Sequence, residues 1–311
     1  MAAMTYRHLQ VRRVAGALGA EITGVDLGAL SDAAFIEIQR AFCEYSAISF
    51  PDQRLRPEQQ CAFTGRFGPL THHPLIATLP GHPHVAGLVR EADSSGMNFG
   101  GTWHADSTFM ESPPFATSLY AIEVPPHGGD TLFASLYLAY ETLSAGMREL
   151  CDRLVVVHSA AAAYDPDRGA NDPKKSLILQ KGMQYNLTED PKKEMEHPLV
   201  CVHPVSGRKV LWETGVYCLR FRDMTEEESA PLLNYLRRHI ANPNFTCRMG
   251  YRPGTLGMWD NRAVQHFAMN DYAGYRRVMH RVQVGGPPPV GPAMPVRAAT
   301  AASQAAPAPV H

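Results

Sequence analysis

The chain has 311 residues, of which 45% are hydrophobic, and it carries 29 basic and 30 acidic side chains. This length suffices for one large core or for two smaller ones. Because the charge is balanced and no long basic run occurs, the sequence argues against nucleic acid and membrane surfaces as partners. A small molecule is the expected partner.

The chain also lacks the usual marks of export. No segment reaches the roughly 18 apolar residues of a membrane span, and residues 1–20 lack the basic start and apolar stretch of a secretion signal. The six cysteines are dispersed and form no Cys-x-x-Cys pair, which favours reduced thiols over a disulfide framework. We therefore expect a cytoplasmic protein.

The N-terminal part of the chain predicts two strands with a helix between them. Residues 18–27 alternate in the manner of a strand, and residues 47–50 form a short apolar run. Between them, Ser31 suits the N-cap of an amphipathic helix that runs toward Tyr45.

A second helix and a loop-rich region follow. Pro57 suits a first helical turn, and this helix should end before Gly68. Residues 70–101 are rich in proline, glycine and histidine, which predicts loops around short strands of the kind that line a pocket. Strands are then expected at residues 116–124 and 131–134, on either side of a turn.

The second half predicts further short strands around one helix. Thr225 and Glu228 form a capping box in front of an apolar helical face. The expected strands are residues 154–159, 198–203, 210–212, 245–251, 255–259 and 277–284. These elements favour a mainly β fold with flanking helices, a double-stranded β-helix or jelly roll. We expect one domain over residues 1–285 and a disordered, Pro- and Ala-rich tail over residues 286–311.

The pair His104 and Asp106 and the distant His266 are candidate metal ligands. Residues two apart on a strand line the same face, so His104 and Asp106 could reach one ion, with the third ligand from elsewhere. Two imidazoles and one carboxylate leave three positions of an octahedron open, as in non-haem Fe(II) oxygenases that bind a cosubstrate and O2. An isolated His-x-Asp pair is more often a surface hydrogen-bonding pair. Zinc could also take these ligands, but no His-Glu-x-x-His motif occurs, so we expect iron.

Five ordered motifs support this interpretation, namely GAEITGVDL at 19–27, RFG at 66–68, WHAD at 103–106, GGDT at 128–131 and WDNRAVQH at 259–266. With them, residues 16–286 resemble the taurine dioxygenase and 2,4-dichlorophenoxyacetate dioxygenase family of Fe(II)- and 2-oxoglutarate-dependent enzymes. The resemblance implies that O2 and 2-oxoglutarate are consumed to hydroxylate a substrate, with release of succinate and CO2. It further implies roles for six residues: the iron ligands His104, Asp106 and His266, the distal-carboxylate residues Thr131 and Arg277, and the substrate residue Arg281.

The spacing of the two arginines agrees with these implied roles. Arg277 and Arg281 are four residues apart, so on one strand both face the same side, while Arg276 and His280 face the other. Two inward guanidinium groups require two anions, because a buried unpaired charge is costly. Each can bind an acid group through two hydrogen bonds, and the Thr131 hydroxyl can donate one more.

The residues around the substrate resemble two different groups within the family. His73, in FGPLTHHP at 67–74, falls where the taurine enzyme has a substrate-binding histidine. Ile76 and Gly100 instead replace a tyrosine and an asparagine of that enzyme. Three further segments are similar to aryloxyalkanoate dioxygenases, namely residues 89–96, 107–109 and 216–218.

We therefore expect an aryloxyalkanoate-type carboxylic acid, which is hydroxylated and then cleaved at its ether, with Ile76, Met97 and Tyr217 as apolar walls. His73 departs from the aryloxy group, and Thr214 stands where both groups carry asparagine. Two alternatives remain open: an alkylsulfonate or alkyl sulfate dioxygenase, and a noncatalytic metal-binding jelly-roll protein. We also expect a homo-oligomer.

Overall fold

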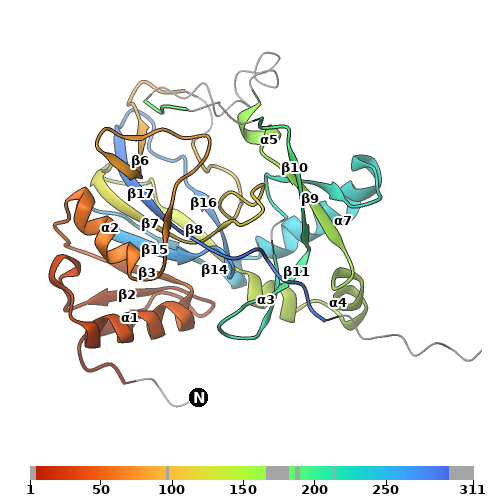
Figure 1. The fold of residues 1–311 in the computed structure, drawn as a ribbon, viewed down its shortest axis with the longest axis horizontal. Coiled ribbons are helices and arrows are strands. Elements are labelled where there is room, and N and C mark those ends of the chain that lie inside the picture. The colour runs from red at the N-terminus through yellow and green to blue at the C-terminus, as the bar shows by residue number, and fades with distance from the viewer. Residues whose placement is uncertain (1–4, 96–97, 166–181, 186–189, 213, 294–311) are drawn as a thin grey trace, which may run out of the picture.

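The computed structural model describes residues 5–95, 98–165, 182–185, 190–212 and 214–293. In this part of the chain the protein is mainly β, with two helices against the outer face of a large sheet and a mixed extension on one side (Figure 1).

Nine of the described strands form one sheet. In order across it they are β1 (Gln10–Arg13), β2 (Ala20–Thr23), β3 (Ala47–Phe50), β15 (Leu256–Asp260), β7 (Pro114–Glu123), β17 (Arg277–Gly285), β6 (His82–Arg90) and β5 (Thr78–Leu79), while β4 (Leu70–Thr71) pairs with β17. The pair β2 and β3 is parallel, and the other pairs are antiparallel. The central strands β15, β7 and β17 come from distant parts of the chain, so this sheet brings those parts together.

Helices α1 (Asp32–Tyr45) and α2 (Pro57–Gly65) cover the outer face of the sheet (Figure 1). The predicted N-cap is present, because Ser31 Oγ accepts a hydrogen bond from the Ala34 amide at 3.2 Å. Ile38 and Phe42 of α1 pack in one buried cluster with Phe50 of β3. Burial of this apolar stripe holds both helices on the sheet.

A second sheet faces the first. It consists, in the described part of the chain, of β14 (Thr246–Met249), β8 (Thr131–Ser135) and β16 (Val264–Ala268). Phe133 of β8 and Leu119 of β7 belong to one buried cluster between the two sheets. His266 pairs with Phe133 across the strands, and Thr131 lies two residues before Phe133, so both share the inner face. The space between the sheets therefore receives polar side chains at one end.

The extension is built from short elements. Its strands are β9 (Val155–Ser159), β10 (Glu194–Pro198) and β13 (Cys218–Phe221), with the hairpin β11 (Val200–Val202) and β12 (Lys209–Leu211). Its helices are α3 (Leu136–Glu141), α4 (Ala145–Cys151), α5 (Ala161–Tyr164) and α7 (Glu226–Ile240), and the described 3-10 turns are η1 (Leu27–Ala29) and η3 (Pro243–Phe245). The predicted capping box starts α7: Thr225 Oγ1 accepts from the Glu228 amide at 3.2 Å, and Glu228 Oε2 accepts from the Thr225 amide at 2.8 Å.

Two expected strands are shorter than predicted. The strand expected at residues 18–27 is confined to β2, because Gly24 has φ 81° and Asp26 caps η1. The strand expected at residues 198–203 is divided between β10 and β11 at the buried Leu199, whose amide donates to Leu154 O. Helices α3, α4 and α5 and strands β13 and β16 were not predicted, since segments this short carry little periodicity.

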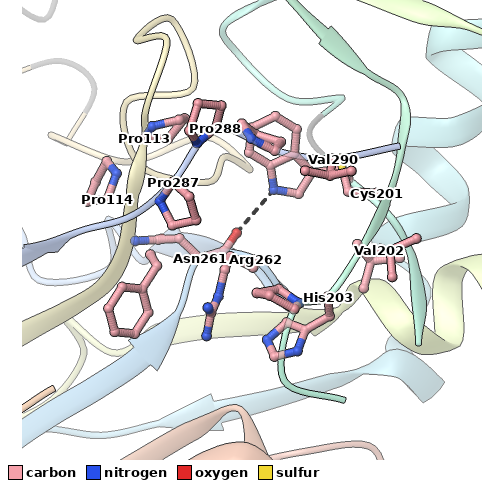
Figure 2. Close-up of a pocket in the computed structure, with 15 residues that line it drawn as sticks. Pro113, Pro114, Cys201, Val202, His203, Asn261, Arg262, Pro287, Pro288 and Val290 are labelled. Carbon is pink, nitrogen blue, oxygen red and sulfur yellow. Dashed lines mark hydrogen bonds between the residues drawn. The ribbon is translucent and has the colours of Figure 1, made fainter. Parts of the chain in front are cut away.

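The beginning of the expected tail is ordered against the protein. The Val202 amide of β11 donates to Val290 O at 2.8 Å, and Pro287, Pro288 and Pro289 cover an apolar cavity beside Trp212 (Figure 2). These contacts correct the expectation of disorder for residues 286–293. Residues 294–311 lie outside the described residues.

Asp260, at the end of β15, links the large sheet to the turn between β11 and β12. Its carboxylate accepts hydrogen bonds from His203 Nε2 at 3.0 Å and from Arg262 Nη2 at 2.6 Å. Burial raises the pKa of this carboxyl, but the hydrogen bonds from Arg262 and His203 outweigh burial and lower its pKa to about 2. Because the folded pKa lies below the unfolded value of 3.8, the stabilisation is complete above about pH 4 and is lost as the pH falls through 2.

We expect Asp260→Asn to lower the free energy of unfolding at pH 7 by about 2 kcal/mol, the equivalent of this pKa shift. Urea titrations at a series of pH values check this. The variant should also show a flatter decline of stability between about pH 4 and pH 2 than the natural protein. Identical declines in both proteins would contradict the assignment of that decline to Asp260.

Candidate metal centre

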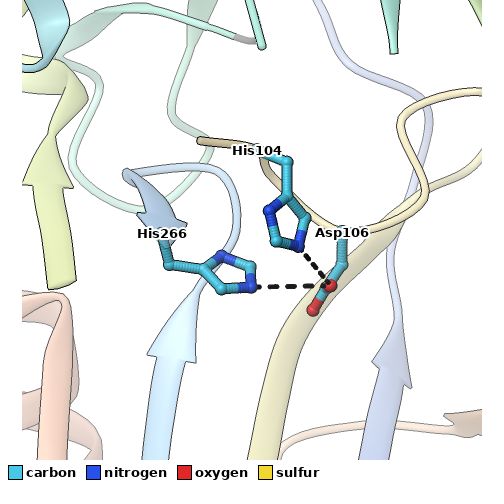
Figure 3. A group of neighbouring side chains, drawn as sticks. All are labelled: His104, Asp106 and His266. Atoms are coloured by element: carbon cyan, nitrogen blue, oxygen red, sulfur yellow. Dashed lines mark ion pairs between the residues drawn. The ribbon is translucent and has the colours of Figure 1, made fainter. Parts of the chain in front are cut away.

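The three predicted metal ligands meet in the structure (Figure 3). Ligand atoms of His104, Asp106 and His266 lie within 4.8 Å of one another, and all three side chains are buried. Nε2 of His104 is 3.8 Å and Nε2 of His266 is 3.7 Å from Oδ1 of Asp106. Within the described residues, no other group of His, Cys, Asp and Glu side chains has this arrangement.

A turn, rather than the expected strand, carries two of these residues. His104 and His266 form an isolated β-bridge, with backbone hydrogen bonds of 3.0 and 2.8 Å. The chain then turns at Asp106, and Ser107 has φ 51°. The strand cannot continue because the Asp106 amide donates to the side-chain oxygen of Asn261 at 3.3 Å instead of to a neighbouring strand. The shared orientation of the ligands therefore comes from the turn.

Both histidines turn Nε2 toward Asp106, and a hydrogen bond fixes the tautomer of His104. His104 Nδ1 lies 2.7 Å from Thr102 O, and since a carbonyl only accepts, Nδ1 carries the proton and Nε2 has a free lone pair. Burial lowers the pKa of His104, and burial together with the nearby His104 lowers the pKa of His266 to about 3. Two neutral imidazoles therefore face the carboxylate.

The carboxylate is ionised. Burial alone would raise the pKa of Asp106, but His266, Arg281 and His104 keep it well below its usual value. Two neutral imidazole nitrogens and one carboxylate oxygen converge on one space, and this donor set fits a divalent transition metal with open positions. These three side chains therefore fit Fe(II).

Gly100 makes room for this arrangement. It has φ 73°, and a Cβ at this position would lie 3.2 Å from Cε1 of His104 and 3.6 Å from Cβ of Ala268. A side chain here would press on the His104 ring, and the positive φ also favours glycine.

Two arginines face the same small cavity of about 40 Å³ as the triad. Arg277 and Arg281 are buried on one face of β17, as their spacing predicted, whereas Arg276 points outward and pairs with Glu91 and Glu123. In the described part of the chain, Nε and Nη2 of both buried arginines have no hydrogen-bond partner. Thr131 lines the cavity as well. The cavity therefore offers unused donors to anionic ligands.

Arg90 is a third buried guanidinium near this cavity, and sequence reasoning missed it. It lies directly opposite Arg277 in the pairing of β6 with β17. Its Nη2 donates to Ser94 O at 3.2 Å, and its Nη1 has no partner among the described residues. The sequence contains one signal for Arg90, a polar residue at the end of an apolar run. The sheet face on which its side chain lies depends on strand pairing.

His73 and Tyr217 lie on another side of the centre. His73 is buried, with Nε2 3.2 Å from the hydroxyl of Tyr164. The Tyr217 ring is edge-on to His104 at 6.1 Å and stacks on Tyr164 at 6.5 Å. Phe109 contacts the rings of His73, Tyr164 and Tyr217. Sequence reasoning missed Tyr164, since only the tertiary fold brings α5 to this place.

The two remaining predicted wall residues are placed differently. Ile76 is buried in a cluster with Ala86 and Met183, against which Leu88 and Phe99 of the metal cavity pack. Ile76 is thus one layer behind the cavity surface. Met97 lies outside the described residues.

A larger apolar cavity of about 280 Å³ lies under Pro287–Val290 (Figure 2). Two of its polar side chains, His203 and Arg262, are paired with the carboxylate of Asp260. Trp212 Nε1 donates to Asn261 O at 3.4 Å on its wall. The smaller cavity therefore holds the side chains suited to binding a metal and anionic ligands, and the larger cavity does not.

Comparison with known proteins agrees with this geometry. The model of the family "Taurine catabolism dioxygenase TauD, TfdA family" matches residues 10–283. The alpha-ketoglutarate-dependent sulfate ester dioxygenase of Pseudomonas putida is 35% identical over 91% of this chain and 91% of its own length. The (S)-phenoxypropionate/alpha-ketoglutarate-dioxygenase of Sphingobium herbicidovorans is 33% identical over 87% of this chain and 92% of its own. The crystal structure of a taurine dioxygenase from Burkholderia xenovorans superimposes with a TM-score of 0.75 at 32% identity, covering 92% of this chain and 94% of that one.

The fold and the triad define a 2-oxoglutarate-dependent non-haem iron dioxygenase, which uses Fe(II) and 2-oxoglutarate. The chain belongs to the TauD/TfdA family. The predicted mainly β jelly roll is confirmed by the family and by the solved structure. This result contradicts the alternative of a noncatalytic metal-binding jelly-roll protein.

Among the described residues, the structure contains no helix with the length and apolar character needed to span a bilayer. The cytoplasmic location and the homo-oligomeric state remain predictions.

Proposed function

We propose that this dioxygenase hydroxylates an alkyl sulfate ester at the carbon bonded to the ester oxygen. The hydroxylated product would then separate into an aldehyde and sulfate. The observation that carries this proposal is the buried pair His73 and Tyr164 near Arg281. A sulfate group has three terminal oxygens, and one guanidinium fork pairs with only two of them.

The hydrogen-bond pattern makes His73 a donor. The Leu75 amide donates to Nδ1 of His73 at 3.1 Å, so the neutral ring carries its proton on Nε2. Burial, followed by the charge of Arg281, lowers the pKa of His73 well below its usual value, which keeps the ring neutral at pH 7. In this structure the Nε2 proton is directed to the Tyr164 oxygen at 3.2 Å. With substrate bound, His73 Nε2 would donate it to the third oxygen, which the fork of Arg281 does not bind.

The metal cavity has side chains suited to both Fe(II) and 2-oxoglutarate. His104, Asp106 and His266 would hold Fe(II), and Arg277 with Thr131 would hold the distal carboxylate of 2-oxoglutarate. Bound together, Fe(II) and 2-oxoglutarate would activate O2 for C–H hydroxylation: one oxygen atom would enter the substrate, and the other would enter the succinate that forms from 2-oxoglutarate with loss of CO2.

The aromatic residues would position the alkyl chain. Tyr217 stands beside His104, and Phe109 packs edge-on against Tyr217 at 5.1 Å. These rings would offer the alkyl chain an apolar surface beside His104 and exclude water from it. Ile76 would support that surface from behind, through Phe99.

An aryloxyalkanoate, the substrate class predicted from the sequence, is the second candidate. The same rings could stack on a phenoxy group, and the Sphingobium relative is named for (S)-phenoxypropionate. A carboxylate has only two oxygens, however, and Arg281 alone can bind both. His73 would then have no anionic partner.

A parallel assay separates these candidates. The Fe(II) enzyme is supplied with 2-oxoglutarate, O2 and either hexyl sulfate, hexanesulfonate or (S)-2-phenoxypropionate, and succinate is measured with sulfate, sulfite or phenol. We expect equimolar sulfate and succinate from hexyl sulfate, with a kcat/KM at least about tenfold above that for (S)-2-phenoxypropionate, as one lost hydrogen bond predicts. A higher kcat/KM with phenol release would transfer the assignment to the aryloxy acids, and sulfite release would transfer it to sulfonates.

The variant His73→Leu tests the donor directly. Loss of a hydrogen bond to a charged group should raise KM for hexyl sulfate by about 10- to 150-fold, with the KM for 2-oxoglutarate unchanged. His197→Leu is the matched control, because His197 is also buried but its Nε2 bonds to Met110 O. Equal KM values for hexyl sulfate in His73→Leu and the natural enzyme would remove His73 from the site.

A further inference from the structure

The two oxygens of Asp106 have different surroundings. Oδ1 faces both histidines, as described above, and also Arg281 Nη1 at 3.9 Å. Oδ2 points away from the histidines and accepts a hydrogen bond from the Thr117 hydroxyl at 2.6 Å. Asn261 Nδ2 lies 3.5 Å from the same oxygen. One oxygen is therefore available to a metal, and the other is bound to protein donors.

The direction of each hydrogen bond around Thr117 follows from its neighbours. The indole of Trp259 can only donate, and its Nε1 is 3.0 Å from Asn261 Oδ1, so the other amide atom of Asn261 is the nitrogen. This nitrogen donates to Thr117 Oγ1 at 3.0 Å, and Gln283 Nε2 donates to the same oxygen at 3.3 Å. With both lone pairs occupied, the hydroxyl must give its one proton to Asp106.

This arrangement is rigid because it lies in the middle of the large sheet. Thr117 of β7 is in register with Trp259 of β15 on one side and with Gln283 of β17 on the other. Thr117 and Gln283 are buried, as is Asn261. Three neighbouring strands thus hold the hydroxyl in place, whereas Asp106 itself lies in a turn.

We propose that Thr117 is a positioning residue that keeps Asp106 bound to the metal through Oδ1 alone. This inference rests on the proposed role of Asp106 as an iron ligand. A carboxylate can bind a metal through one oxygen or through both, and binding through both would occupy one of the three positions needed by 2-oxoglutarate and O2. Arg281 attracts Oδ1 toward the substrate side, and the Thr117 hydroxyl resists that movement by holding Oδ2.

The test compares Co(II) binding by Thr117→Val, Thr117→Ser and the natural protein. Valine has the shape of threonine without the hydroxyl, and serine keeps the hydroxyl. We expect Co(II) affinity to fall by about 10- to 100-fold in Thr117→Val and to recover in Thr117→Ser. The visible Co(II) absorption should change in Thr117→Val, because a second carboxylate oxygen would take a position that solvent can occupy in the natural protein.

Ser118→Ala is the matched control for a general loss of stability. Ser118 is the next residue of β7 and is also buried, but its hydroxyl bonds to Thr64 at 2.8 Å and to Gln60 at 3.2 Å on the opposite face. Ser118→Ala should lower the melting temperature and leave Co(II) affinity and absorption unchanged. Affinities are compared at a temperature where every variant is folded.

Three results of the Co(II) experiment would contradict the proposal in different ways. Natural Co(II) affinity and absorption in Thr117→Val would overturn the positioning role and leave the metal site itself intact. Weak binding in both Thr117→Val and Thr117→Ser would contradict a role for the hydroxyl alone, because serine keeps it, and would assign the effect to the packing of the whole side chain. No Co(II) binding by the natural protein would contradict the proposed ligands, and with them the proposed function.

Discussion

Replacing His104 by alanine is expected to abolish succinate formation and to lower the Fe(II) content of the protein. His104 contributes one of only two imidazole nitrogens in the triad. Losing a direct ligand should cost more than losing an outer partner of a ligand, so the rate should fall by more than about a hundredfold. Succinate assays and metal analysis of the same sample check this.

His127→Ala is the control for the removal of a histidine, since His127 is exposed and stacks edge-on against Tyr275. It should retain both Fe(II) and activity. Normal succinate production by His104→Ala would mean that the metal is bound elsewhere. Loss of Fe(II) from both variants would show that the measured metal does not report on the triad.

Arg277→Leu is expected to weaken 2-oxoglutarate binding by about 30- to 5000-fold, the equivalent of about 2–5 kcal/mol for the loss of a buried charge partner. The same change should leave the melting temperature without 2-oxoglutarate equal or higher. Arg277 is a buried cation with unused donors, and it lies opposite a second cation, Arg90. Removing one of two like charges relieves their repulsion. Calorimetric titration of 2-oxoglutarate into the Mn(II)-loaded protein and a thermal melt measure the two effects.

The adjacent Arg276→Leu provides the control. Arg276 directly precedes β17 and pairs with Glu91 and Glu123 near the surface. It should leave 2-oxoglutarate affinity within about threefold, because exposed ion pairs contribute little. Equal losses of affinity in both variants would indicate damage to the strand and would contradict a direct role for Arg277.

Helices with strong terminal signals were predictable from the sequence. Ser31 and Thr225 cap α1 and α7 as expected, because a cap acts on amides within the next turn. The single strand expected at residues 18–27 shortened to β2, and the one at residues 198–203 was divided. Apolar alternation reports which side chains can be buried, but the end of a strand depends on the backbone of its neighbour.

In the candidate site, too, some features follow from local spacing and others depend on the tertiary structure. Arg277 and Arg281 share a face because their spacing on one strand requires it. Asp106 joins His104 through a turn, and Thr117, Asn261 and Arg90 act from elements whose neighbours are far away in the chain. Local spacing could not reveal these three residues.

The sequence by itself determined the class of metal site, the family and the inward pair of arginines, because motifs and strand periodicity are local properties of the chain. The tertiary structure decided which oxygen of Asp106 faces the cavity, which buried guanidinium lies opposite Arg277 and which hydroxyl lies beside Nε2 of His73. Those features arise from hydrogen bonds and strand pairings between distant segments. Such contacts depend on how the whole chain is packed, and no local pattern encodes them.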